Sequence, residues 1–112
     1  MASFSIVAHI DVDQTPVSGS RNAGSSAWSS VEAPKEHVIN KDKVQFAWTH
    51  DSTEERYDVV WDDLVEVIPG TGIEQPRKLS IRVHCYSKKG PLSGGAWADL
   101  KATGDFVKYV VK

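Results

Sequence analysis

The stretch Leu79-Ser80-Ile81-Arg82-Val83-His84-Cys85-Tyr86 alternates apolar and polar side chains, position by position. A two-residue period places the apolar side chains on one face of an extended strand and the polar ones on the other. The stretch therefore predicts a β-strand with one buried face. Cys85 continues the apolar series, which favours a buried thiol that packs as a small core side chain.

Three further stretches share this rhythm and are rich in β-branched or aromatic residues: Phe4 to Val12, Lys43 to His50 and Phe106 to Val111. Segments rich in Gly, Pro, Ser and Asn, which favour turns, lie between them: Gln14 to Ser26, Pro69 to Gly72 and Lys88 to Pro91. This spacing predicts an all-β fold, an antiparallel β-sandwich or a related small β architecture, with about seven to nine strands.

The segment from Asp51 to Ile68 supports two interpretations. Its apolar side chains recur at helical spacing behind a Ser52-x-x-Glu55 capping box, so one short helix within 52–68 stays open. Valine and aspartate form helices poorly, however, and a polar connection between Val44–His50 and Arg56–Trp61 suits a hairpin. We favour the hairpin, followed by a strand from Leu64 to Ile68.

A weak internal similarity relates the two ends of the chain. Phe4 to His9 aligns with Leu79 to His84, and without a gap Pro16 to Gly19 then falls on Pro91 to Gly94. A duplication in a pseudo-symmetric fold would produce this agreement, and so would a chance match between strand-and-turn segments.

Composition indicates one domain spanning residues 1–112, because 112 residues with 40% hydrophobic and 25% charged side chains suffice for a single core. The net charge of -2 disfavours nucleic acid as a partner. No apolar run is long enough to span a membrane, and the N-terminal residues lack the pattern of a signal peptide. We expect a cytoplasmic protein, or one released without a signal peptide, with no disulfide because Cys85 is the single cysteine.

Signatures of catalysis and of metal binding are missing from the sequence. It has no Gly-x-Ser-x-Gly elbow, no phosphate-binding loop and no Cys-x-x-Cys pair. We therefore expect no enzymatic activity, no cofactor and no metal site. The carboxylates between Asp51 and Glu66 admit calcium binding, but we interpret them as a solvated acidic surface that also discourages edge-to-edge aggregation.

Four tryptophans are a high share for 112 residues, and Trp28 and Trp97 stand beside Gly- and Ser-rich segments. Each indole either caps the end of a small core or offers a flat platform on which a sugar ring stacks. For the second case we predict Trp28 and Trp97 as stacking residues, with Arg21, Asn22 and Asp99 forming hydrogen bonds to hydroxyl groups.

Two stretches carry a resemblance to known proteins. Ala27-Trp28-Ser29-Ser30-Val31, followed by Lys43-Val44-Gln45-Phe46-Ala47 and a polar turn, resembles small fungal β-sandwich proteins, a group that includes fruit-body lectins and aegerolysin-like lipid binders. The resemblance assigns no family and implies no binding residue.

The sequence as a whole favours a carbohydrate-binding, lectin-like module. Its partner would be a glycan or glycoconjugate, and self-association into a homo-oligomer would strengthen weak single sites. A β-sandwich protein that binds lipid or membrane surfaces is the alternative, since aromatic side chains at loop tips also suit a lipid headgroup boundary. A protein-binding inhibitor or interaction module is a further alternative.

Overall fold

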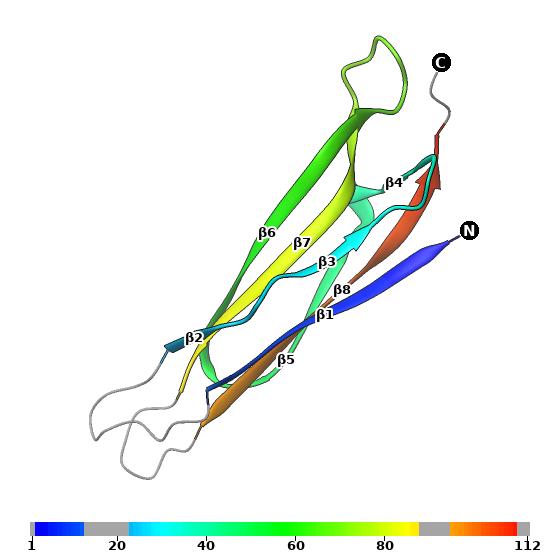
Figure 1. The fold of residues 1–112 in the computed structure, drawn as a ribbon. Coiled ribbons are helices and arrows are strands. Elements are labelled where there is room, and N and C mark those ends of the chain that lie inside the picture. Colours follow the sequence, from blue (N-terminus) through cyan, green and yellow to red (C-terminus); the bar gives the residue numbers. More distant parts are fainter. Residues whose placement is uncertain (1, 13–22, 88–94, 110–112) are drawn as a thin grey trace.

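The computed structural model describes residues 2–12, 23–87 and 95–109, and it confirms the predicted all-β fold (Figure 1). Within these ranges the strands are β1 (Ser3–Val12), β2 (Ala23–Ser25), β3 (Ser29–Glu32), β4 (His37–Ile39), β5 (Gln45–Asp51), β6 (Thr53–Glu66), β7 (Glu74–Tyr86) and β8 (Ala96–Lys108). The 3-10 turn Lys41–Lys43 is the one helical element of the described residues.

Two antiparallel sheets pack together as a sandwich, each built around one long central strand. In the first sheet, β8 lies between β1 on one side and β4 and β5 on the other. In the second sheet, β7 lies between β6 on one side and β2 and β3 on the other. The molecule is elongated, with extents of 62 × 24 × 18 Å, because the strands of both sheets run along the same axis (Figure 1).

The core is formed by alternate side chains of the two central strands. On β7 these are Leu79, Ile81 and Val83, and all three are completely buried. On β8, Leu100 is also completely buried. Each such aliphatic side chain contributes about 1.5–3 kcal/mol through removal from water. Cys85 follows in the same series and is completely buried, as the alternation predicts, and burial raises the pKa of its thiol.

The structure corrects both interpretations of residues 51–68. A single strand, β6, covers most of this segment, and it pairs with β7 in the second sheet, whereas β5 pairs with β8 in the first. The predicted hairpin between Val44–His50 and Arg56–Trp61 and the short helix are therefore both wrong. Leu64 belongs to β6, which ends at Glu66, so the separate strand from Leu64 to Ile68 does not form.

The hairpin that does form joins β6 to β7. Residues 67–73 connect the two strands, and Gly70 and Gly72 adopt positive φ angles of 83° and 74° there. A left-handed backbone at these positions favours glycine, which has no Cβ. The predicted turn at Pro69 to Gly72 is thus confirmed, and it joins the strands that contain Leu64 and Leu79.

Both open sides of the sandwich are closed by specific contacts. On one side, the Ser29 hydroxyl of β3 donates a hydrogen bond of 2.9 Å to the Val7 carbonyl of β1. On the other side, Tyr57 of β6 packs against two aromatic rings of β5, at centroid distances of 5.1 Å from Phe46 and 5.9 Å from Trp48. These contacts hold β1 close to β3 and β5 close to β6.

The segments that suggested an internal repeat hold different places in the fold. Phe4 to His9 belongs to β1, an edge strand, whereas Leu79 to His84 belongs to β7, a central strand. Pro16 to Gly19 and Pro91 to Gly94 lie outside the described residues.

Of the described part of the chain, no helix has the length and apolar character needed to span a membrane.

Candidate functional site

Trp28 stands on the outer face of the second sheet, in the link between β2 and β3. Its side chain is 44% exposed, so this indole is not part of the core. The guanidinium carbon of Arg82 lies 4.6 Å from the centroid of the indole ring. At this distance a cation is attracted to the face of the ring, and the contact restrains the orientation of the indole.

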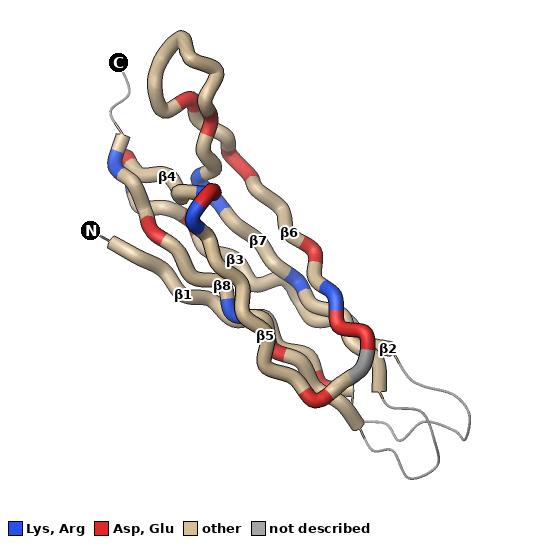
Figure 2. The backbone as a smooth tube through the Cα atoms, turned by 180° about the vertical axis from the view of Figure 1, so that it is seen from behind, with Lys and Arg blue, Asp and Glu red and all other residues tan. Residues whose placement is uncertain are grey.

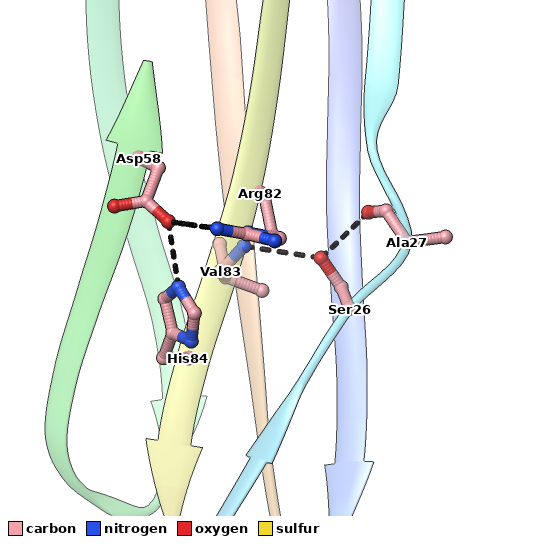
Figure 3. A network of polar contacts seen from close by, with 6 residues as sticks. All are labelled: Ser26, Ala27, Asp58, Arg82, Val83 and His84. Atoms are coloured by element: carbon pink, nitrogen blue, oxygen red, sulfur yellow. Dashed lines mark hydrogen bonds and ion pairs between the residues drawn. The ribbon is translucent and has the colours of Figure 1, made fainter.

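Arg82 is itself held by the neighbouring strand. Its Nε and Nη2 atoms donate hydrogen bonds of 3.1 Å and 2.8 Å to Oδ2 of Asp58, which lies directly opposite on β6. Nε2 of His84 lies 2.7 Å from the same oxygen (Figure 3). The contacts with His84 and then Arg82 lower the pKa of Asp58, so its carboxylate stays charged.

Ser26 fixes the backbone just before Trp28. The Val83 amide donates a hydrogen bond of 3.0 Å to the Ser26 hydroxyl, which in turn donates to the Ala27 carbonyl at 2.7 Å (Figure 3). The Ser26 amide also donates to the Val83 carbonyl at 2.9 Å. This link therefore follows β7 closely, although it is not part of the β-ladder, and it places Trp28 beside Arg82.

A shallow hollow of about 310 Å³ lies beside the indole. It is lined by aromatic, hydroxyl, aliphatic and charged side chains from β3, β6, β7 and the link before β3: Trp28, Ser30, Val60, Asp62, Lys78 and Ser80. The hydroxyls of Ser30 and Ser80 are 2.8 Å apart and form a hydrogen bond. The hollow thus combines an aromatic plane with short polar groups that can donate and accept hydrogen bonds.

The other predicted site residues do not join Trp28. Trp97 and Asp99 alternate with the buried residues Ala96, Ala98 and Leu100 on β8, so they lie on the outer face of the first sheet. Two packed sheets separate them from Trp28. Arg21 and Asn22 lie outside the described residues. The predicted combination of two tryptophans with Asp99 therefore does not form one site.

Trp97 and Asp99 have a polar environment of their own. His9 of β1 contacts Asp99 through Nδ1, and its Nε2 lies 2.7 Å from Oδ2 of Asp11. The hydrogen bond with Asp11 and then the one with Asp99 raise the pKa of His9 above 6.5. In the strand register Asp11 and Asp51 lie opposite Trp97 on its two sides.

A larger open hollow of about 840 Å³ also lies on the first sheet. Ser5, Lys43, Lys101 and Thr103 line it. Its one aromatic residue, Phe4, is only 8% exposed and belongs to the core. This hollow therefore offers no flat aromatic surface, in contrast to the hollow beside Trp28.

The acidic residues of β6 are partly neutralised by the strand next to them. Asp58 lies opposite Arg82 and Asp62 opposite Lys78, and Figure 2 shows acidic positions at intervals along β6 beside basic positions of β7. Glu55 contacts Nδ1 of His50 at 2.7 Å.

Within residues 2–12, 23–87 and 95–109, no three His, Cys, Asp or Glu side chains are grouped so that they could hold a metal ion.

Sequence reasoning missed the residues that support Trp28. Arg82, His84 and Asp58 appear as ordinary polar positions of alternating segments, and nothing in the linear order shows that β6 pairs with β7. The polar face of Leu79 to Tyr86 was the available signal, because an arginine and a histidine two positions apart on a strand share one face.

A scan against protein-family models matched none, and searches of curated proteins and of solved structures returned no significant match.

Proposed function

We propose that this protein is a carbohydrate-binding module, not an enzyme, and that it binds a sugar in the hollow beside Trp28. The observation that carries the proposal is the Trp28 indole, which is 44% exposed, is restrained by the guanidinium of Arg82 and is bordered by short polar side chains. The apolar face of a pyranose stacks on such a plane, while its hydroxyl groups exchange hydrogen bonds with the residues around it.

Preorganisation supports this assignment. Trp28 is held by Arg82, which is held by Asp58, so little side-chain freedom remains to be lost when a ligand stacks on the indole. The serine pair Ser30 and Ser80 and the charged pair Asp62 and Lys78 provide both donors and acceptors. Because the two charges of that pair balance, a neutral sugar suits the hollow better than an anionic one.

The experiment is a glycan array on the purified protein, followed by titration calorimetry with the best soluble glycan. We expect Trp28→Ala to weaken binding about tenfold or more, since it removes a central aromatic contact. Trp97→Ala is the matched control, because it removes an indole from the outer face of the opposite sheet. Loss of binding in Trp97→Ala with normal binding in Trp28→Ala would contradict the proposed site.

A second candidate function, binding to a lipid surface, is favoured by one specific observation. Leu64 near the end of β6, and Ile68 and Ile73 in the connection to β7, are 53%, 55% and 53% exposed, so all three lie toward the same end of the β6–β7 hairpin. Exposed apolar side chains clustered at one end of a molecule mark contact surfaces. Sedimentation of the protein with neutral vesicles tests this function. The double variant Ile68→Asp with Ile73→Asp should abolish any binding to the vesicles and should leave glycan binding unchanged.

A further inference from the structure

β6 has a free edge. Within the described part of the chain it pairs with β7 on one side and with no strand on the other. Such an edge presents unpaired backbone N–H and C=O groups to any strand that can align with it. The regular part of β6 is bounded by a bulge before Arg56 and by the left-handed backbone of Asp63, whose φ is 57°. The edge open to pairing is therefore Arg56 to Asp62.

The charged ends of this segment, Arg56 and Asp62, lie at equal distances from Val59, its middle residue, and are opposite in sign. When two copies pair antiparallel around a two-fold axis at Val59, Arg56 of each copy lies opposite Asp62 of the other. Directly opposed residues of an antiparallel pair share one face, and opposite charges there stabilise the pair. The axis thus creates two equivalent ion pairs from one sequence.

Arg56 and Asp62 are available for these contacts. Both side chains are exposed, and neither forms a hydrogen bond or an ion pair with another described residue. The third charged residue of this segment, Asp58, is already bound by Arg82 and His84. The symmetric pairing therefore matches Arg56 and Asp62, the two charges of the segment that form no direct ion pair within the described residues, although Lys78 lies opposite Asp62 on β7.

Neighbouring registers are disfavoured by like charges. An axis at Asp58 opposes that carboxylate to its own copy, and an axis at Val60 opposes Asp58 to Asp62. Like charges directly opposite each other destabilise a strand pair. The acidic residues of β6 therefore disfavour these shifted pairings. An axis at Tyr57 opposes Arg56 to Asp58, but Arg82 and His84 already bind that carboxylate, and the bulge before Arg56 leaves only Arg56 to Asp58 paired. The pairing at Val59 matches opposite charges over the whole segment.

The inner face of the segment also gains from this pairing. Tyr57 is 40% exposed although it packs against Phe46 and Trp48 at the side of the sandwich. In the pairing at Val59 it lies opposite Trp61 of the second copy. Cross-strand aromatic pairs are favourable, and this one would cover the exposed part of the tyrosine ring.

We propose that two copies of this chain form a homodimer by antiparallel pairing of β6, with the two-fold axis at Val59 and reciprocal Arg56–Asp62 ion pairs. The second sheets of both copies then form one continuous sheet. This inference does not depend on the carbohydrate-binding function, because it rests on the edge and its charges alone.

Sedimentation equilibrium of the purified chain tests the dimer. We expect the dimer dissociation constant to rise about tenfold or more in Arg56→Asp and in Asp62→Arg, because each change converts two attractive contacts into repulsive ones. The double variant Arg56→Asp with Asp62→Arg should restore the dimer, since it exchanges the two charges. Lys35→Asp is the control for Arg56→Asp, because it makes the same change in net charge at an exposed position outside the strand.

The outcomes decide the proposal in both directions. Dimers that are weakened by each single change and restored by the double change support it, as does slower amide hydrogen exchange in Arg56 to Asp62 at concentrations that favour the dimer. A wild-type chain that stays monomeric up to millimolar concentration overturns it. So does a dimer that both single variants leave intact, because its interface then lies elsewhere. Circular dichroism of each variant confirms that the fold is retained.

Discussion

His9 illustrates how a single residue can make stability depend on pH. Its ring contacts the carboxylates of Asp11 and Asp99, which raise its pKa above 6.5 in the folded state. A raised pKa contributes stability that is fully present below the unfolded-state pKa and is lost as pH rises through the folded-state pKa. We therefore predict that His9 stabilises the fold in mild acid and contributes less at higher pH.

The measurement is the urea midpoint at several pH values from about pH 5 to about pH 9, compared between wild type and His9→Gln. The difference in midpoint should be largest at the acidic end and should shrink as pH rises. Taking the difference removes the effect of Asp58, whose lowered pKa acts in the opposite sense and reduces stability only as pH falls. A difference that grows with rising pH would contradict the prediction.

At the same scale, the sequence identified individual candidates but not their grouping. Trp28 could be chosen because it stands beside Gly and Ser residues, and it is exposed in the structure. Its support by Arg82 and Asp58 could not be predicted, because the two residues are far apart in sequence and meet only through the pairing of β6 with β7. Trp97 could be chosen for the same reason as Trp28, yet it lies on the opposite sheet.

At the scale of elements, alternation predicted strands well and their partners poorly. Phe4 to Val12 lies within β1, and Leu79 to Tyr86 falls within β7, because one buried face imposes a two-residue period. The same local pattern leaves open which strand lies alongside. A short polar connection after β5 suited a hairpin, but the chain uses it to pass from one sheet to the other.

Gly104 supplies a prediction at this scale, because it allows β1 and β8 to pack closely. A Cβ atom there would lie 2.8 Å from Cε1 of Phe4 and 3.1 Å from Cγ2 of Val44. Phe4 also packs against Phe106, with ring centroids 5.3 Å apart, so its ring has little room to move. We expect Gly104→Ala to destabilise the fold by about 1–3 kcal/mol through overpacking.

Chemical denaturation of Gly104→Ala measures this cost, with Lys101→Ala as the control on the same strand. Lys101 is exposed, so its truncation should change the free energy of unfolding by no more than about 0.5 kcal/mol. Equal stability of the two variants would show that Phe4 can shift without cost.

At the scale of the whole molecule, the proposed dimer has a consequence for binding. The hollow beside Trp28 lies on the outer face of the second sheet, and pairing through β6 makes that face continuous between two copies. Both hollows then open on the same side of the dimer. A surface that carries many glycans can engage both at once, and linked sites can exceed single-site affinity by about 10² to 10⁴.

The variant Arg56→Asp separates the affinity of a single site from the avidity of the dimer, because Arg56 does not line the hollow beside Trp28 of its own copy. We predict that, at concentrations where both proteins are monomeric, this variant binds a soluble monovalent glycan with wild-type affinity in calorimetry. It should nevertheless dissociate faster from a densely glycosylated surface in plasmon resonance. The double variant Arg56→Asp with Asp62→Arg also changes a residue that lines the hollow, because Asp62 lies there. Slow dissociation of this variant from the dense surface should therefore return only as far as the variant keeps its affinity for the monovalent glycan. If Arg56→Asp and wild type leave the dense surface at the same rate, the two hollows do not act together, and pairing through β6 does not provide the avidity of this protein.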